Sequence, residues 1–214
     1  MVLLVMLVGT WFVARACPCF HRGQLWGIGT WTWFWLAVEI PIVHQIYVWF
    51  CWRTELHHGL ISRIFGGLAF PLYAAGFTLM VVGRLVALVA LAIASRGSVY
   101  ATPALLASLK ILSVVLLLPV LYAAYSVLRN FSIRRVFGAD HFDASYRTGG
   151  LVRDGIFRWT PNALYVFAFL AMWIPGLWFA SRPAIIAALF SHLYIWVHYF
   201  TTEKPDMRRI YGAS

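Results

Sequence analysis

Two short polar segments near the carboxyl end of the chain carry side chains that could do chemistry. The first segment contains Asn162 and Tyr165, and the second contains His198, Glu203 and Lys204. An imidazole can act as a general base near neutral pH, and a carboxylate with an ammonium group can hold a zwitterionic ligand by charge-assisted hydrogen bonds. The same residue types also anchor membrane helices at the headgroup level, so the segments alone leave both interpretations open.

The elements between the two segments predict that the segments meet. Two apolar stretches, 161–180 and 183–202, are joined by a very tight connection at Arg182. Helices joined by so short a connection pack antiparallel as a hairpin, and the outer ends of a hairpin return to the same face. We therefore expect the amide and phenol of the first segment to lie close to the imidazole, carboxylate and amine of the second.

The composition indicates a membrane protein. Hydrophobic residues make up 62% of the 214 residues and charged residues only 11%, whereas a soluble domain has about 45–50% and about 25%. These values exclude a disordered chain and disfavour a water-soluble domain. The apolar stretches are continuous rather than alternating, which disfavours a membrane β-barrel. We therefore expect an all-α, polytopic helix bundle that forms a single membrane domain over residues 1–214.

The apolar stretches predict five or six transmembrane helices, of which the last two form a C-terminal hairpin. A span needs about 20 mostly apolar residues, so the short first stretch could instead lie at the membrane interface. The third stretch is long enough to be tilted, or broken near Pro71 or Gly83. The stretches are 1–14, 24–52, 64–94, 101–128, 161–180 and 183–202, and residues 1–128 contain the N-terminal spans.

The excess of basic residues indicates which partners the protein binds and how it is oriented in the membrane. The chain has 17 Lys and Arg against 7 Asp and Glu, a net charge of +10. In a helical membrane protein this excess favours the anionic cytosolic leaflet as partner rather than nucleic acid. Eleven of the basic residues fall in loops on one side of a six-span arrangement and four on the other. The positive-inside rule therefore predicts that both termini, the polar stretch 129–159 and the candidate site face the cytosol.

Polar residues within the apolar stretches are further candidates. Glu39 and His44 lie five residues apart, which is about 140° around a helix, so they do not share one face. An intramembrane carboxylate such as Glu39 marks a functional site or a structural pair, here with Arg84 or Lys110.

No metal site is predicted. His192 and His198 are six residues apart and lack the i, i+4 spacing of two ligands on one helix face. Cys17 and Cys19 bracket a proline but have no second pair, and three cysteines are too few for a disulfide framework.

The two polar segments belong to a longer pattern. A glycine-rich lead precedes the first segment, and an aromatic–glycine pair follows the second. The pattern resembles the carboxyl-terminal signature of the integral-membrane methyltransferases, the superfamily of phospholipid methyltransferases and isoprenylcysteine carboxyl methyltransferases. The pieces that carry the resemblance are Gly149–Val152, Gly155–Tyr165, Glu203–Met207 and Tyr211–Gly212, preceded by Phe137, Gly138, Asp140 and Phe142. The chain departs from the family pattern at Pro161, Ala163, Phe167 and Lys204.

The resemblance implies S-adenosylmethionine as the cofactor, bound by residues 129–214 at the cytosolic end of the last helices. It also implies a lipophilic acceptor that enters from the bilayer. Glu203 would hold the ammonium group of the cofactor, and Arg158 or Lys204 would hold its carboxylate. Asn162 would contact the adenine edge or the amino-acid part of the cofactor.

The resemblance implies roles for three further side chains. Tyr165 and Trp159 would pack on the adenine or offer a cation–π face to the sulfonium. His198 would act catalytically, beside Glu203, as the base that takes a proton from an acceptor amine.

Three functions follow from these observations. Asn162 stands where the isoprenylcysteine branch has a histidine, which favours methyl transfer to a phospholipid amine such as phosphatidylethanolamine. Methylation of an isoprenylated cysteine carboxylate is the alternative within the superfamily. A non-catalytic membrane scaffold or a small transporter is the alternative of another class, supported by intramembrane Glu39, Arg84 and Lys110, although no inverted repeat is evident.

The charge count generates a topology prediction. Reporters placed at Gly149 and after Ser214 should both report the cytosol, and a reporter in the loop 95–100 should report the opposite side. A compartment-sensitive enzyme fusion at each position measures this. Finding Gly149 and Ser214 on different sides would contradict the hairpin and the shared site with it.

Overall fold

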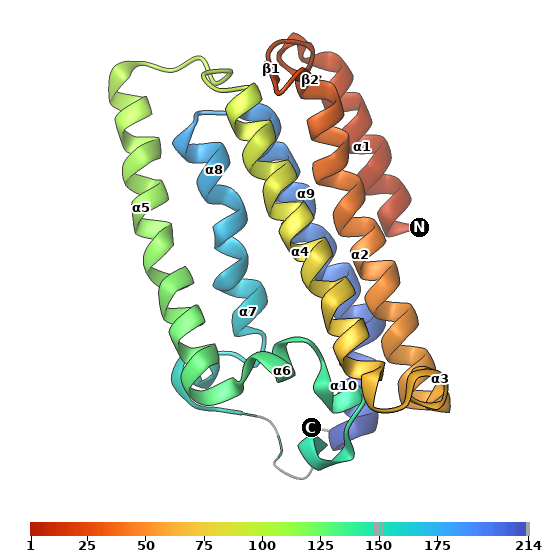
Figure 1. The fold of residues 1–214 in the computed structure, drawn as a ribbon. Coiled ribbons are helices and arrows are strands. Elements are labelled where there is room, and N and C mark those ends of the chain that lie inside the picture. Colours follow the sequence, from red (N-terminus) through yellow and green to blue (C-terminus); the bar gives the residue numbers. More distant parts are fainter. Residues whose placement is uncertain (148–149, 151, 213–214) are drawn as a thin grey trace.

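The computed structural model describes residues 1–147, 150 and 152–212. The positions Gly149, Leu151 and Ser214, on which part of the pattern and two of the reporters fall, lie outside the described residues. The described part is a bundle of long helices with one two-stranded ribbon (Figure 1). The expectation of an all-α bundle is confirmed.

Four helical stretches are long and apolar enough to cross a membrane, which is consistent with an integral membrane protein. They are 30–58, 60–94, 103–131 and 182–211. Two shorter apolar stretches accompany them, namely α1 (Val2–Ala16) and the segment 163–178. The long helices are α2 (Thr30–His58), α4 (Ala69–Ala94), α5 (Pro103–Ser126) and α9 (Arg182–His198), and α10 (Lys204–Tyr211) extends α9.

The second stretch begins later and ends later than the sequence predicted. Strand β1 (Gln24–Leu25) pairs antiparallel with β2 (Ile28–Gly29), so that α2 begins only at Thr30. At its other end α2 runs to His58, where Gly59 adopts a left-handed conformation and its N–H bonds the last carbonyls. The structure therefore replaces the predicted span 24–52 with a hairpin and a shifted helix.

The third stretch is divided before the helix rather than within it. The short α3 (Leu60–Phe65) and the turn Gly66–Leu68 precede α4. Pro71 lies in the first turn of α4, where a proline removes no intrahelical hydrogen bond, and the helix continues through Gly83. Of the two alternatives considered for this stretch, a tilt or a break near Pro71 or Gly83, the structure excludes the break.

The predicted hairpin forms, but its first arm is not a regular helix. It consists of α7 (Ala163–Val166), the 3₁₀ turn Ala168–Met172 and α8 (Trp173–Trp178). The Ser181 hydroxyl caps α9 by accepting from the N–H of Ala184 at 3.1 Å. A Cβ on Gly176 would lie 2.9 Å from the backbone nitrogen of Ile185, so only glycine lets the two arms approach this closely.

Between α5 and α7 the chain folds into short turns at the end of the bundle where α10 lies, here called the α10 end (Figure 1). A left-handed glycine, Gly138, lets this segment turn beneath the indole of Trp52. The turns are the π turn Val127–Phe131, α6 (Ile133–Val136), and the 3₁₀ turns Ala139–His141, Ala144–Arg147 and Gly155–Arg158.

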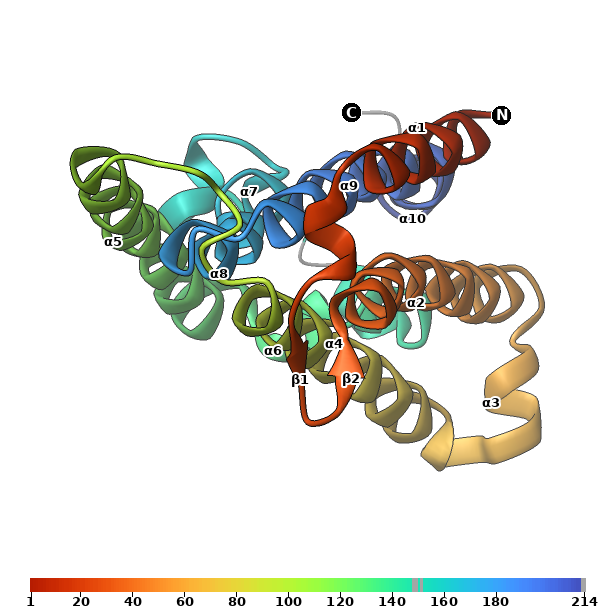
Figure 2. The same ribbon diagram turned by 90° about the horizontal axis from the view of Figure 1, so that it is seen from above.

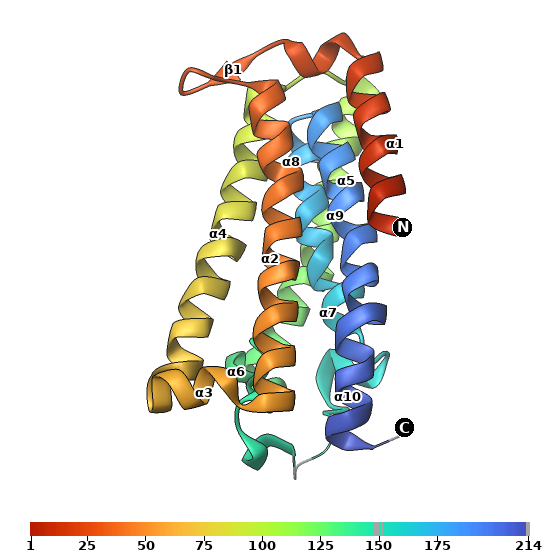
Figure 3. The same ribbon diagram turned by 90° about the vertical axis from the view of Figure 1, so that its right-hand side faces the viewer.

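The helices form two groups around α9. Helices α2 and α4 pack along each other, and α9 lies against both of them, with α1 beside α9 (Figures 2 and 3). Helix α5 instead packs on the first arm of the hairpin, at one edge of the bundle. Only 6% of the most apolar segment of this stretch is buried, so most apolar side chains of α5 face away from the bundle.

The contact between Gly138 and Trp52 generates a stability prediction. Gly138→Ala should destabilise the protein strongly, because its Cβ would overlap the Trp52 indole and its φ is +76°. Gly97→Ala is the matched control, since Gly97 has a φ of +71° but no atom within 4 Å of a built Cβ. We expect a cost of about 1–2 kcal/mol for the control from backbone strain alone and at least 1 kcal/mol more for Gly138→Ala.

Thermal unfolding of the detergent-purified variants measures the difference. Equal losses for the two variants would mean that the Trp52 contact does not constrain the turn.

Candidate active site

A cavity of about 670 Å³ opens at the α10 end of the bundle. Ligand sites typically have about 300–1,000 Å³ and mostly apolar walls with a few polar groups. Its walls come from α2, α4, α9, α10, the first hairpin arm and the turns 131–141. Five residues predicted from the sequence line this one cavity: Asn162, Tyr165, His198, Glu203 and Lys204.

A widened turn aims Glu203 into the cavity. The last helix does not end at Thr202 as predicted but continues through the π turn Tyr199–Glu203 into α10. Because Pro205 has no N–H, the carbonyl of Thr201 lacks its usual intrahelical hydrogen bond. Instead, Arg53 Nη2 of α2 donates to this carbonyl at 3.1 Å. The N–H of Lys204 bonds the carbonyl of Tyr199, five residues back. The extra residue in this turn reorients Glu203 relative to α9.

Tyr165 and Glu203 join the two arms of the hairpin. The Tyr165 hydroxyl donates a hydrogen bond to the Glu203 carboxylate across 38 residues of sequence. The Tyr165 ring also packs edge-on against Trp196 and Tyr199, with centroids 6.0 Å and 6.1 Å away. The phenol and carboxylate of the two polar segments are therefore in direct contact.

Asn162 precedes the first turn of α7, and its carbonyl accepts the N–H groups of Tyr165 and Val166 at 3.0 Å and 3.1 Å. Its side chain makes no capping bond. Arg158 and Trp159 lie elsewhere: both are exposed, neither lines the cavity, and the Arg158 guanidinium stacks over the Trp159 ring at 5.4 Å.

His198 and Lys204 contribute the remaining predicted groups. His198 is buried, lies 5.6 Å from the Trp52 ring and makes no hydrogen bond to another described residue. The Lys204 ammonium lies over the ring of Phe200, with 5.4 Å to its centroid. Both nitrogen groups border the cavity.

A buried carboxylate that the sequence did not single out binds α10 to α2. Asp206 is 1% exposed, and its two oxygens face Arg53 Nε at 2.9 Å and His141 Nε2 at 3.4 Å. The His141 imidazole in turn stacks on the Trp52 indole, with 4.2 Å between the ring centroids. The only hint in the sequence is that Asp206 follows Glu203 by three residues, which places it near the same helix face.

The chain after α5 closes the cavity through a second set of polar contacts. The Tyr211 hydroxyl donates to the buried carboxylate of Asp140. Arg135 donates to the carbonyls of Tyr146 at 2.7 Å and Gly150 at 3.3 Å. These bonds hold the turns 131–146 over the α10 end.

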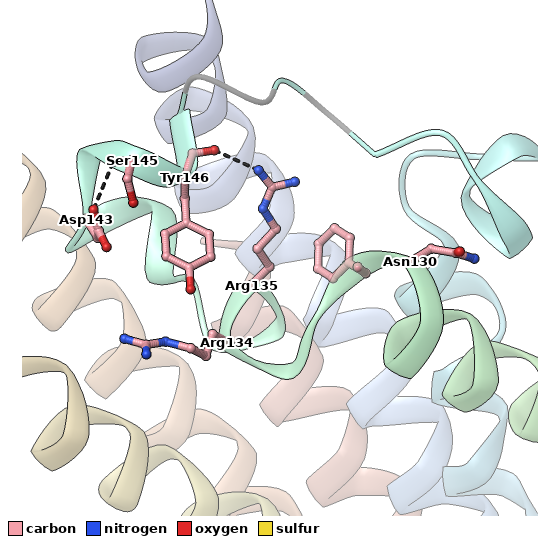
Figure 4. Close-up of a pocket in the computed structure, with 7 residues that line it drawn as sticks. Asn130, Arg134, Arg135, Asp143, Ser145 and Tyr146 are labelled. Carbon is pink, nitrogen blue, oxygen red and sulfur yellow. Dashed lines mark hydrogen bonds between the residues drawn. The ribbon is translucent and has the colours of Figure 1, made fainter.

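A separate open groove of about 490 Å³ lies on the outside of these turns (Figure 4). Arg134, Asp143, Ser145 and Tyr146 are among the residues that line it. Arg135 and Phe131 line both the groove and the cavity, so the two spaces adjoin at these side chains.

Polar residues from α2 and α4 line the inner part of the cavity. They are His44, Gln45 and Arg84, all buried. Two of them, His44 and Arg84, were considered as intramembrane polar residues, but no motif placed them at this site. Glu39, considered as a partner for Arg84 or Lys110, is exposed on α2, and no ion pair joins it to either residue in the described part of the chain. The Lys110 ammonium lies over the ring of Trp178, at 5.9 Å.

The structure contains no group of three or more potential metal-binding side chains among the residues it describes. Cys17 and Cys19, the pair considered as half a metal site, form a disulfide with each other.

Comparison with known proteins gives one match. Residues 108–214 match the model of the phospholipid methyltransferase family, which is half of the chain. The matched region begins within α5 and includes Asn162, Tyr165, His198, Glu203 and Lys204. The searches of curated proteins and of solved structures found no match.

The ion pair between α2 and α10 generates a prediction. Arg53→Gln should cost about 3–5 kcal/mol of unfolding free energy, because it removes one partner of a nearly buried carboxylate. Asp206→Asn should cost less, since the Arg53 side chain is 30% exposed and keeps contact with solvent. The double variant should lose clearly less than the sum of the two.

Chemical or thermal unfolding in detergent measures these losses. Arg63→Gln serves as control, because Arg63 is exposed on α3 and forms no ion pair with a described residue. Strictly additive losses at Arg53 and Asp206 would contradict a coupled pair.

Proposed function

The chain belongs to the phospholipid methyltransferase family, and we propose that it transfers a methyl group from S-adenosylmethionine to the amine of a membrane phospholipid. The observation that carries the proposal is the meeting of the two polar segments in one cavity, with Tyr165 bonded to Glu203. If these side chains only anchored the helices at the lipid headgroups, they would have no reason to converge on one cavity.

The cavity suits a cofactor of this chemistry. Its volume of about 670 Å³ accommodates a ligand the size of a nucleoside with an amino-acid tail. One part of its wall carries a carboxylate and an ammonium group, Glu203 and Lys204, for a zwitterion. Aromatic rings, including those of Tyr165 and Tyr199, line the same part of the cavity.

Each side chain at the α10 end has a distinct task in this proposal. Glu203 binds the ammonium group of the cofactor, with Tyr165 holding the carboxylate in place, and Lys204 binds the carboxylate of the cofactor. Asn162 contributes its side-chain amide, which makes no capping bond to α7. Bound S-adenosylmethionine would supply a methyl group activated by the positive charge of its sulfonium.

His198 handles the proton in this proposal. An amine is protonated in water and has no free electron pair, so the acceptor must lose a proton before its nitrogen can attack. His198 lines the cavity and has no hydrogen-bond partner among the described residues. Its imidazole accepts the proton, and the buried apolar walls exclude water from the reacting groups.

The acceptor reaches the cavity from the side of α4. Thr78 and Leu85 of α4 line the cavity and are exposed, so the cavity is open beside them. A lipid chain can therefore lie along α4 while its headgroup points inward. Asn162 in place of a histidine favours a phospholipid amine over an isoprenylcysteine carboxylate as the acceptor. The α10 end would face the cytosol, where the cofactor is made.

The proposal predicts the affinity for S-adenosylhomocysteine. Glu203→Gln removes one charge-assisted hydrogen bond and should weaken binding by about 10- to 150-fold. Asn162→Ala should also weaken binding, and the double variant should lose clearly less than the sum, because both side chains hold one zwitterion. Isothermal titration of detergent-purified protein measures the affinities, and Glu39→Gln, a carboxylate outside the cavity, is the control.

Methyl transfer itself is tested by incubating membranes that contain the protein with radiolabelled S-adenosylmethionine and separating the lipids. Label in N-methylated phospholipid supports the proposal. Label in carboxyl methyl esters of prenylated peptides would instead assign the protein to the other branch. Unchanged affinity in both variants, with small additive losses of stability, would favour a scaffold.

A further inference from the structure

The geometry points to an anion-binding subsite at the inner end of the cavity, formed by Arg84 and His44, that takes the phosphate of the acceptor lipid. This inference rests on the proposed function, because it names the part of the acceptor that lies next to the methylated amine. It gives a binding role to Arg84 and His44, which lie outside the region that matches the family model.

Arg84 carries a charge deep in the bundle without a hydrogen-bond or ion-pair partner among the described residues. It lies 15 residues after the start of α4, which is about 22 Å along the helix from the α10 end. It is 6% exposed and lines the cavity, and it forms no hydrogen bond or ion pair with any residue that the structure describes. Its guanidinium lies 4.8 Å from the ring centroid of Phe169.

His44 adds a second polar group without a partner. It is 4% exposed, and both of its ring nitrogens are buried without a hydrogen bond in the described structure. The ring packs edge-on against Phe77, with 4.6 Å between centroids, and borders the cavity. Arg84 and His198, which line the same cavity, are both within electrostatic range of this ring.

The charges around Arg84 do not neutralise it. His192 is also within electrostatic range, but its Nδ1 accepts a hydrogen bond from Trp173 at 3.0 Å. The carboxylates that line the cavity, Glu203 and Asp140, are bonded to tyrosines at the α10 end. A cation inside a membrane protein is costly and is normally paired or exposed to a water-filled space. An anionic ligand is therefore the partner that this site lacks.

The chemistry of the acceptor identifies that anion. In an aminophospholipid the phosphate stands between the lipid chains and the amine, two carbons away from the nitrogen. Chains that enter beside Thr78 and Leu85 place the phosphate near Arg84 and His44. The amine then points along the cavity toward His198. A guanidinium binds a phosphate with two parallel hydrogen bonds, which a single ammonium group cannot do.

The first test measures binding without methyl transfer, so it stands even if the proposed function fails. Dodecyl phosphate should raise the melting temperature of the purified protein and of Lys110→Gln, a control that removes an intramembrane cation outside the cavity. For Arg84→Gln the apparent affinity should fall about 10- to 100-fold. Equal stabilisation of Arg84→Gln would overturn the subsite. Equal stabilisation by inorganic phosphate at the same concentration would overturn the lipid as its source.

The second test separates acceptors in the methyl-transfer assay. For Arg84→Gln we expect the KM for phosphatidylethanolamine to rise about 10- to 100-fold. The KM for sphingosine, an amine without phosphate, and the affinity for S-adenosylhomocysteine should stay unchanged. Arg84→Lys, which keeps the charge but not the paired donors, should lie between the wild type and Arg84→Gln. Equal losses with both acceptors, or a loss of S-adenosylhomocysteine binding, would show a structural role and overturn the inference.

Discussion

The carboxylate of Asp206 organises the α10 end of the molecule. It is almost fully removed from solvent and meets an arginine of α2 and a histidine of the turns after α5. Three parts of the chain that are distant in sequence are thereby tied to one buried charge. Because an uncompensated charge in this position is costly, the three parts adopt their arrangement together. Glu203 lies three residues before Asp206, so its position follows from the same contact.

The cavity has two polar ends separated by apolar and aromatic walls. Acidic and basic side chains meet at the α10 end, where Tyr165 binds Glu203. At the inner end lies the guanidinium of Arg84, which has no ion-pair partner in the described part of the chain. Both ends use groups that are expensive to bury. In a bundle whose outer surface is apolar, such groups indicate a space built for a ligand that is both polar and lipid-like.

Much of the helical arrangement followed from composition and from the lengths of the apolar stretches. The convergence of Asn162, Tyr165, His198, Glu203 and Lys204 followed from the tight connection at Arg182, because a hairpin imposes it. Element boundaries were less accurate, since they depend on local turns. The left-handed Gly59 and the π turn before Pro205 shift helix ends without changing the hydrophobic pattern. The roles assigned to the site residues stay predictions.

The contributions of α2 and α4 could not be predicted from the sequence. Trp52 and Arg84 reach the cavity, and Arg53 reaches Asp206, only through long-range packing. No spacing rule connects these three residues with residues 108–214. Asp140 and His141 lie in a turn whose path depends on Gly138 fitting beneath an indole. Periodicity reports which face of a helix is apolar but not which helices become neighbours.

The division of the cavity between two stretches of the chain has a consequence for how such enzymes diversify. On the proposed assignment, the groups that hold the methyl donor lie in the matched region, and the groups that hold the acceptor phosphate lie in α2 and α4. Mutations in the two stretches therefore fall under different selective pressures. After gene duplication, one copy can drift toward a new lipid through changes in α2 and α4, while it inherits the ancestral use of the same methyl donor.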